Sequence, residues 1–233
     1  SPLGASEPCS APSGSGPPPE GVPLSFPASR PPRCLLAWRL ELAGQHVTLI
    51  GSTVLPNASQ VAGGIINPVT RRWMTKSWGF DMLISHAAAT YREREQQFEV
   101  ELYHPIPLVR YCQNSSDVKR LGRRMRNPRY ANVLGDPIDK GDGPDSFEDT
   151  HGSFQIKQAA YVRLPLLLQT LREHFAQAGI FRDETYSHAN LTRQDSQWSY
   201  HDLEADHVIF SEGVGMQDNP WFNWLPLTPA KGE

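Results

Sequence analysis

The sequence lacks the patterns that mark several large classes of protein. Its three cysteines, Cys9, Cys34 and Cys112, are far apart and odd in number, so they form neither a disulfide framework nor a CxxC metal pair. This cysteine usage predicts a reducing, cytoplasmic location and no metal site. No apolar run approaches the roughly 20 residues that span a bilayer, so no membrane partner is expected. HExxH and GxSxG are also absent, which excludes the zinc proteases and serine hydrolases that depend on them.

Strong charge of one sign is absent too, because the net charge is only −3 and charged residues make up 20% of the chain. This balance argues against a general nucleic-acid or membrane binder. One basic run, VKRLGRRMRNPRY, is the exception. It can be a solvated helix face or, as an alternative function, a surface that binds RNA phosphates. Its cations are Lys119, Arg120, Arg123, Arg124, Arg126 and Arg129.

Residues 1–33 are rich in proline, serine and glycine and have few aliphatic side chains to bury, so they are predicted to be disordered. The motif GVPLSF has a proline in its middle and is not expected to form a strand. Helical spacing of apolar residues starts at Cys34 and ends at Gly44, and the β-branched run 46–50 predicts a buried parallel strand.

Further along, helices and strands alternate, which predicts an α/β fold. Helices are expected at 79–97, at 116–126 and from Leu164 to Ala178. Strands are expected within 98–113 and 150–162, which suggest antiparallel pairing, and at 206–213. The span 135–153, rich in Asp, Gly and Pro, predicts a loop or an excursion from the fold.

The most informative stretch for function is NASQVAGGIINPVTRRW, residues 57–73. A glycine pair among small residues allows the backbone to approach a flat ligand or a phosphate closely and offers free N–H donors. The alternative is a tight turn that leads into a strand.

The order of these segments resembles the FAD-dependent oxidoreductases of the D-amino-acid oxidase, glycine oxidase and sarcosine oxidase superfamily. After the helix and strand at 34–50 come S-x-x-A-G-G-I-I-x-P, Y-V-x-L-P-x-L-L-x-x-L, D-x-V-I-F-S-E-G and finally L-P-L-x-P-x-K-G-E. The resemblance covers residues 34–233. It implies a Rossmann-like FAD-binding domain at 34–78 and 155–215. An inserted antiparallel-sheet substrate domain, incomplete in this chain, would begin at 79–154 and 216–233.

The resemblance also implies a cofactor, a reaction and a set of site residues. The cofactor is FAD, and the reaction is hydride transfer to the flavin from a carbon that bears an amine, in a small amine or amino-acid substrate. The small-residue segment would pass the flavin and pyrophosphate with Ser59, Ala62, Gly63, Gly64 and Ile65. A strand end would lie under the nucleotide half with Ser211, Glu212 and Gly213, and Tyr186 would contact the adenine. No catalytic residue is implied.

The sequence departs from this family at the phosphate-binding loop. Ala28, Arg30 and Arg33 stand where GxGxxG has glycines, and the first strand after the helix ends at Gly51 rather than an acid. We therefore expect residues 1–33 not to be the ancestral N-terminus and the chain to be a fragment. The alternative to an enzyme is a non-catalytic remnant that no longer binds flavin.

Overall fold

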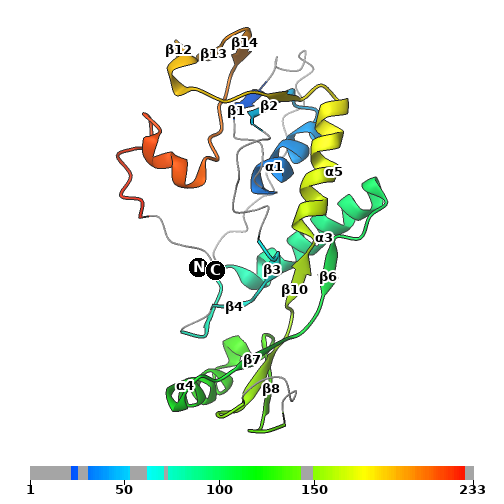
Figure 1. Ribbon diagram of the computed structural model, residues 1–233, viewed down its shortest axis with the longest axis vertical. Coiled ribbons are helices and arrows are strands. Elements are labelled where there is room, and N and C mark those ends of the chain that lie inside the picture. The colour runs from blue at the N-terminus through cyan, green and yellow to red at the C-terminus, as the bar shows by residue number, and fades with distance from the viewer. Residues whose placement is uncertain (1–21, 26–30, 53–61, 71–72, 143–148, 229–233) are drawn as a thin grey trace, which may run out of the picture.

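The computed structural model describes residues 22–25, 31–52, 62–70, 73–142 and 149–228. The molecule is elongated, with a parallel sheet near one end and an antiparallel sheet at the other, joined by a middle layer of strands and a long helix (Figure 1). None of the described helices is long and apolar enough to cross a membrane.

The parallel sheet has the strand order β1-β2-β11, and each strand runs in the same direction as its neighbour. Its strands are β1 (Val22–Ser25), β2 (Val47–Gly51) and β11 (Phe181–Asp183). Helix α1 (Pro31–Leu42) connects β1 to β2, and α5 (Leu164–Gln177) precedes β11. The two helices contact each other. Together these elements make a βαβ unit extended by a second helix–strand pair.

The core of this end forms because α1, α5 and β2 turn their apolar residues toward one another. Gly44 and Gly179 have positive φ values of 74° and 69°, so both helices end at residues that adopt this conformation without strain. Buried side chains fill the space between the elements. They are Cys34, Ala37, Trp38, Val47, Leu49, Leu102, Val162, Leu167, Leu168, Leu171 and Phe175.

The middle layer is the antiparallel sheet β3-β10-β6 and helix α3 (Phe80–Phe98). Its strands are β3 (Ile65–Ile66), β10 (Ala160–Val162) and β6 (Tyr103–Pro105). The turn from α3 into β6 is fixed by Glu95, whose Oε1 accepts the backbone N–H groups of Leu102 and Tyr103 at 2.7 Å. β10 then leads directly into α5, which joins this layer to the parallel sheet.

The far end contains the antiparallel sheet β7-β9-β8 and helix α4 (Ser115–Met125). Its strands are β7 (Leu108–Tyr111), β9 (Ser153–Ile156) and β8 (Leu134–Ile138). The Asn114 side chain accepts the N–H of Asp117 and so caps α4. A 3-10 turn (Pro128–Tyr130) and the pair β4 (Val69–Thr70) and β5 (Thr75–Lys76) complete this end, which has its own apolar core.

A meander of three short strands follows β11: β12 (Leu191–Gln194), β13 (Gln197–Tyr200) and β14 (Leu203–Ala205). Two 3-10 turns, His188–Asn190 and Gly213–Asp218, flank it. Aromatic side chains gather beside the meander and pack on Ile50 at the end of β2. They are Tyr186, Trp198, Tyr200, Phe210 and Trp221.

Three sequence-based expectations about elements are wrong. Residues 22–25 do form a strand, and Pro23 is tolerated because β1 is the edge of its sheet, paired with β2 alone among the described residues. Residues 206–212 form no strand, because side chains rather than a backbone ladder hold that segment. The span 135–153 is not a continuous loop, because β8 and β9 enter it from both sides.

The pairing of β8 with β9 explains this last error. The register shifts between Leu134 and Pro137, so the Asp-Pro dipeptide sits in an irregular part of the strand. A Cβ on Gly135 would lie 2.8 Å from the Gln155 Cβ, so the glycine allows the two strands to approach. Composition alone predicted a loop here because Gly, Asp and Pro are common in both situations.

Candidate functional site

The first part of the candidate site is the start of helix α1, which follows β1 (Figure 1). In βαβ units that bind dinucleotides, the N–H groups of this first helical turn hold the pyrophosphate. Here the helix begins with Pro31 and Pro32. Arg33 follows with 1% of its surface exposed, and its guanidinium donates a hydrogen bond to the backbone carbonyl of Ser211.

Cys34, the next residue of α1, is expected to resist alkylation in the folded protein. It is 2% exposed, and burial raises the pKa of its thiol to about 11 from an ordinary value of 9.0. At pH 8 we expect iodoacetamide to react at Cys34 at least about a hundredfold faster in urea than in buffer, because the thiolate is the nucleophile. Mass spectrometry of the Cys34 peptide measures both rates, and equal rates would contradict the burial.

The folded state holds the thiol proton of Cys34 more tightly than the unfolded state does. The stability that this proton contributes is therefore complete below pH 9 and is lost as the pH rises through about 11.

The second part of the site is the segment Ala62–Gly63–Gly64, which leads into β3. Gly64 has a φ of +66°, and a Cβ at this position would lie 2.0 Å from the carbonyl oxygen of Val162. Only glycine satisfies both conditions. Ala62 and Gly63 are exposed, and 62% of the Ile65 surface is accessible. The segment therefore exposes its backbone and the side chains of Ala62 and Ile65, while Gly64 packs tightly against β10.

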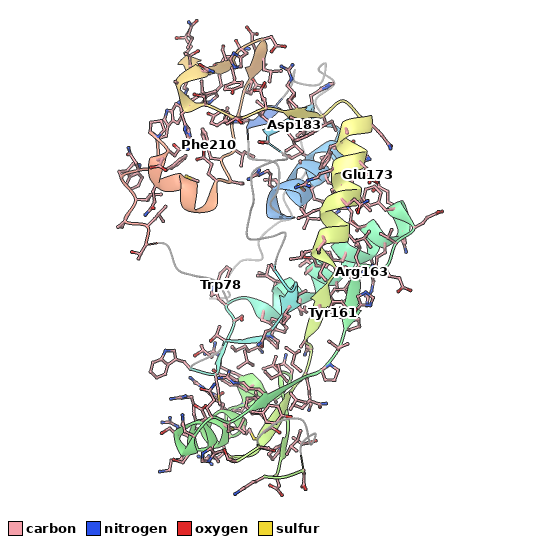
Figure 2. All side chains as sticks on the ribbon, viewed as in Figure 1. Trp78, Tyr161, Arg163, Glu173, Asp183 and Phe210 are labelled. Atoms are coloured by element: carbon pink, nitrogen blue, oxygen red, sulfur yellow. The ribbon has the colours of Figure 1, made fainter. Side chains whose placement is uncertain are left out.

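The register of the middle sheet places three side chains from distant parts of the chain on one face. Tyr161 on β10 is the direct partner of Ile65 on β3 and of His104 on β6. The His104 and Tyr161 rings stack with centroids 4.5 Å apart. Tyr103 and Pro105, the neighbours of His104, line a groove together with residues of α3, so they point to the other face of the sheet. Figure 2 shows Tyr161 at the junction of the middle layer with α5.

The sequence patterns do not predict that Ile65, His104 and Tyr161 are cross-strand partners. The only signal that could have found them is the alternation of residues along β6 and β10, and it does not reveal which strands pair. We call Ile65, Tyr161 and His104 the open face of the middle sheet.

Ser211, Glu212 and Tyr186, which the sequence resemblance assigns to the nucleotide half, lie near the parallel sheet. Ser211 and Glu212 do not form the strand end that the resemblance implied. Ser211 contacts the start of α1 through Arg33. The Glu212 carboxylate lies 2.7 Å from both His188 Nε2 and Asn219 Nδ2, and Asn219 is fully buried. Tyr186 stacks on Tyr200 at 5.1 Å and meets the His188 ring edge-on at 5.0 Å.

These contacts give both residues a structural explanation, because Tyr186 packs within the aromatic cluster and Glu212 is held beside it by His188 and Asn219. Gly213 has a φ of 61° and opens the 3-10 turn that follows. Ser59 and the closing segment 229–233 lie outside the described residues.

The basic run does not form a uniform patch of free cations. Arg120 pairs with Asp117 at 2.9 Å and lies over the Trp73 ring. Arg124 donates to the Trp73 carbonyl and lies over Tyr130. Arg120 and Arg124 therefore contact residues inside and outside α4, and RNA binding by the basic run stays an alternative. Across the part of the chain that the structure describes, no group of acidic, histidine and cysteine side chains could hold a metal ion.

The mixed helix and strand architecture, with a βαβ unit joined to antiparallel layers, defines the class of fold found in FAD-dependent oxidases. The chain belongs to the FAD dependent oxidoreductase family, also named DAO, whose model matches residues 34–233. This family membership confirms the resemblance that the sequence order indicated.

Solved structures with a similar fold include iminodiacetate oxidase from Chelativorans sp. BNC1, with a TM-score of 0.65 and 19% identity over 86% of this chain and 57% of the other. Glycine oxidase from Bacillus cereus ATCC 14579 has a TM-score of 0.64 and 12% identity, over 83% of this chain and 55% of the other. L-Proline dehydrogenase from P. horikoshii has a TM-score of 0.62 and 8% identity, over 89% and 57%. The chain thus spans little more than half the length of these proteins.

FAD is the cofactor of this family, and the residues of this chain fit its two halves unequally. The start of α1 does not fit a pyrophosphate, because proline has no N–H to donate and the bulky Arg33 side chain is buried there, bonded to the Ser211 carbonyl. The Gly63–Gly64 segment does fit the close approach of a flat ring, because it exposes backbone beside Ile65 and has no side chain to obstruct.

Proposed function

We propose that this chain is the cofactor-side part of an FAD-dependent oxidoreductase of the amino-acid oxidase type, acting on a small amine or amino acid. The match of the family model to residues 34–233 carries this proposal. The fold shared with iminodiacetate oxidase and glycine oxidase supports it. The cytoplasmic location inferred from cysteine usage is part of the same proposal.

The proposed reaction would transfer a hydride from the carbon that bears the amine to the flavin and release an amine N–H proton to solvent, so that the substrate is oxidised by two electrons to an imine. Bound FAD supplies the two-electron acceptor. The chain's own residues bind and orient it. Gly63 and Gly64 permit close approach of the ring system, Ile65 and Tyr161 offer an apolar surface, and His104 borders that surface. These groups would also exclude water from the reacting carbon.

The remaining site assignments belong to this proposal as well. Ser59 and Ala62 would complete the small-residue segment beside the cofactor. Ser211, Glu212 and Gly213 would lie toward its nucleotide half, with Tyr186 near the adenine. The contact between Ser211 and the start of α1 supports the first of these placements.

We further propose a Rossmann-like FAD-binding domain formed by residues 34–78 and 155–215, and a substrate domain, incomplete in this chain, that begins at 79–154 and 216–233. The parallel order β1-β2-β11 with α1 and α5 supports the first unit, and the antiparallel β7-β9-β8 sheet supports the second. The proposed boundary at 155 falls within β9, so the two units would share this strand.

Flavin binding tests the proposal. Titration of the purified chain into FAD is expected to quench the flavin fluorescence and to leave a yellow protein after gel filtration. Ile65→Asp is expected to weaken binding by about tenfold or more, because a carboxylate would be desolvated against the ring. Ile106→Asp is the matched control, because Ile106 is also exposed, at 41%, and lies outside the open face.

Two outcomes would favour the alternatives. A folded, colourless protein that binds no flavin would contradict the proposal and support a non-catalytic remnant. RNA binding that falls steeply with salt would support the basic run as the functional surface. Equal loss of flavin binding in Ile65→Asp and Ile106→Asp would argue against the open face as the site.

A further inference from the structure

The start of α1 carries information beyond family membership, because it bears on which half of the cofactor this chain can hold. Most of the affinity of a βαβ unit for a pyrophosphate comes from backbone N–H groups aligned at a helix N-terminus. The first two residues of α1 are Pro31 and Pro32, neither of which has an N–H. The preceding residues, FPASR, contain no glycine.

Arg33 occupies the position where the dinucleotide motif has its third glycine, whose role is close packing of the helix on the sheet. The Arg33 side chain is instead 1% exposed and donates to the Ser211 carbonyl. A guanidinium that is buried and bonded to a backbone carbonyl is not accessible to a phosphate at the protein surface.

The position that normally binds the ribose also lacks its usual side chain. The strand after α1 normally ends in an acidic residue that binds the ribose hydroxyls, and β2 ends at the buried Gly51. Glycine offers no side chain for this contact. Two independent positions, the start of α1 and the end of β2, therefore lack the groups that bind the ADP half of a dinucleotide.

The residues proposed to contact the flavin half, in contrast, leave room for a flat ring. Gly63, Gly64 and the open face residues retain an accessible backbone and an apolar surface, and Gly64 is tightly packed on Val162. Val162 belongs to the same buried cluster as Cys34, so the start of α1 and the Gly63–Gly64 segment pack on one core. They differ in the groups that they offer to a cofactor.

We infer that this chain holds FAD by its flavin half alone, and that the residues proposed to lie toward the nucleotide half add no affinity, because the Ser211 carbonyl, the Glu212 carboxylate and the Tyr186 ring are already engaged within the protein. This inference rests on the proposed function. It distinguishes the chain from a dinucleotide-binding protein, for which the pyrophosphate contacts supply much of the binding free energy.

Comparison of riboflavin with FAD tests the inference, because the two share the ring and differ in the ADP half. Fluorescence titration of the chain is expected to give dissociation constants within about threefold of each other, and excess ADP is expected not to displace either flavin. FAD binding more than about tenfold tighter than riboflavin, or displacement by ADP, would overturn the inference while leaving the proposed function intact. Absence of binding by both flavins would overturn the proposed function and, with it, the claim that the flavin half is held.

A designed phosphate loop provides a second test. The changes Ala28→Gly, Arg30→Gly and Arg33→Gly with Pro31→Ala and Pro32→Ala restore the glycines and the helix N–H groups. This variant is expected to bind FAD about tenfold or more tightly than riboflavin. Arg39→Ala is the control, because Arg39 lies on the same helix but is half exposed and pairs with Glu93 at the surface. A folded loop variant that still binds both flavins equally would overturn the account of Arg33 and the prolines.

Discussion

Alanine in place of Gly64 is expected to lower the free energy of unfolding by about 3 kcal/mol or more. The Cβ would lie 2.0 Å from the carbonyl oxygen of Val162, and the backbone φ of +66° is itself unfavourable for alanine. The clash is with backbone, so no side-chain rotation relieves it. The hydrogen bond from the Val162 N–H to the Gly64 carbonyl must then be lost or displaced. Urea denaturation followed by circular dichroism measures the change.

Gly63→Ala is the matched control for this experiment. A Cβ at Gly63 meets only the Ile65 side chain, at 3.8 Å, which is ordinary contact. We expect the free energy of unfolding to change by less than about 1 kcal/mol. The two variants add the same methyl group to adjacent residues, so equal destabilisation would show that the tight packing of β3 on β10 is not what requires glycine at 64.

Three elements of the parallel end were predictable because their signals are local. Helix α1 and strand β2 follow from apolar spacing, Gly44 and a β-branched run, and α5 follows from its apolar face and Gly179. Each of these signals lies within the element that it predicts or within two residues of its end. The helix at 79–97 was predicted for the same reason and is observed as α3 over residues 80–98.

The elements that were predicted wrongly depend on distant partners. The run at 206–213 has the composition of a buried strand, but Phe210 packs on Trp221 and Glu212 bonds with Asn219, and no strand forms. Conversely, Pro23 is compatible with β1 only because β2 lies on one side of it. Composition does not specify whether a ladder partner is available, so these outcomes could not be read from the sequence.

The residues of the candidate site also divide into those with a local sequence signal and those that depend on distant partners. The glycine pair at 63–64 is visible in the sequence as a local motif, and its role beside a cofactor stays a prediction. The open face has no such signal, because Ile65, His104 and Tyr161 become neighbours only through the register of three strands that are far apart in the chain. The burial of Arg33 against Ser211 was equally invisible, since 178 positions separate them.

The second large expected change in the free energy of unfolding concerns a buried charge between α1 and α3. Arg94 is fully buried, stacks on the Trp38 ring, and donates to Gln97 Oε1 at 3.0 Å. Its Nε and Nη2 atoms are buried and have no hydrogen-bond partner among the described residues. Burial lowers the pKa of this guanidinium to about 9, with the nearby Arg39 charge adding to the effect. A buried cation without a carboxylate partner opposes folding.

Arg94→Met is therefore expected to raise the free energy of unfolding by about 1–3 kcal/mol, because methionine fills a similar volume, keeps contact with Trp38 and removes the charge. Arg92→Met on the exposed side of α3 should change it by less than about 0.5 kcal/mol. The folded state binds this proton less tightly than the unfolded state does, so the wild-type protein gains stability as the pH rises above about 9. The advantage of Arg94→Met should shrink over the same range in thermal melts. A variant less stable than the wild type at pH 7 would show that the stacking on Trp38 and the bond to Gln97 outweigh the cost of burying the charge.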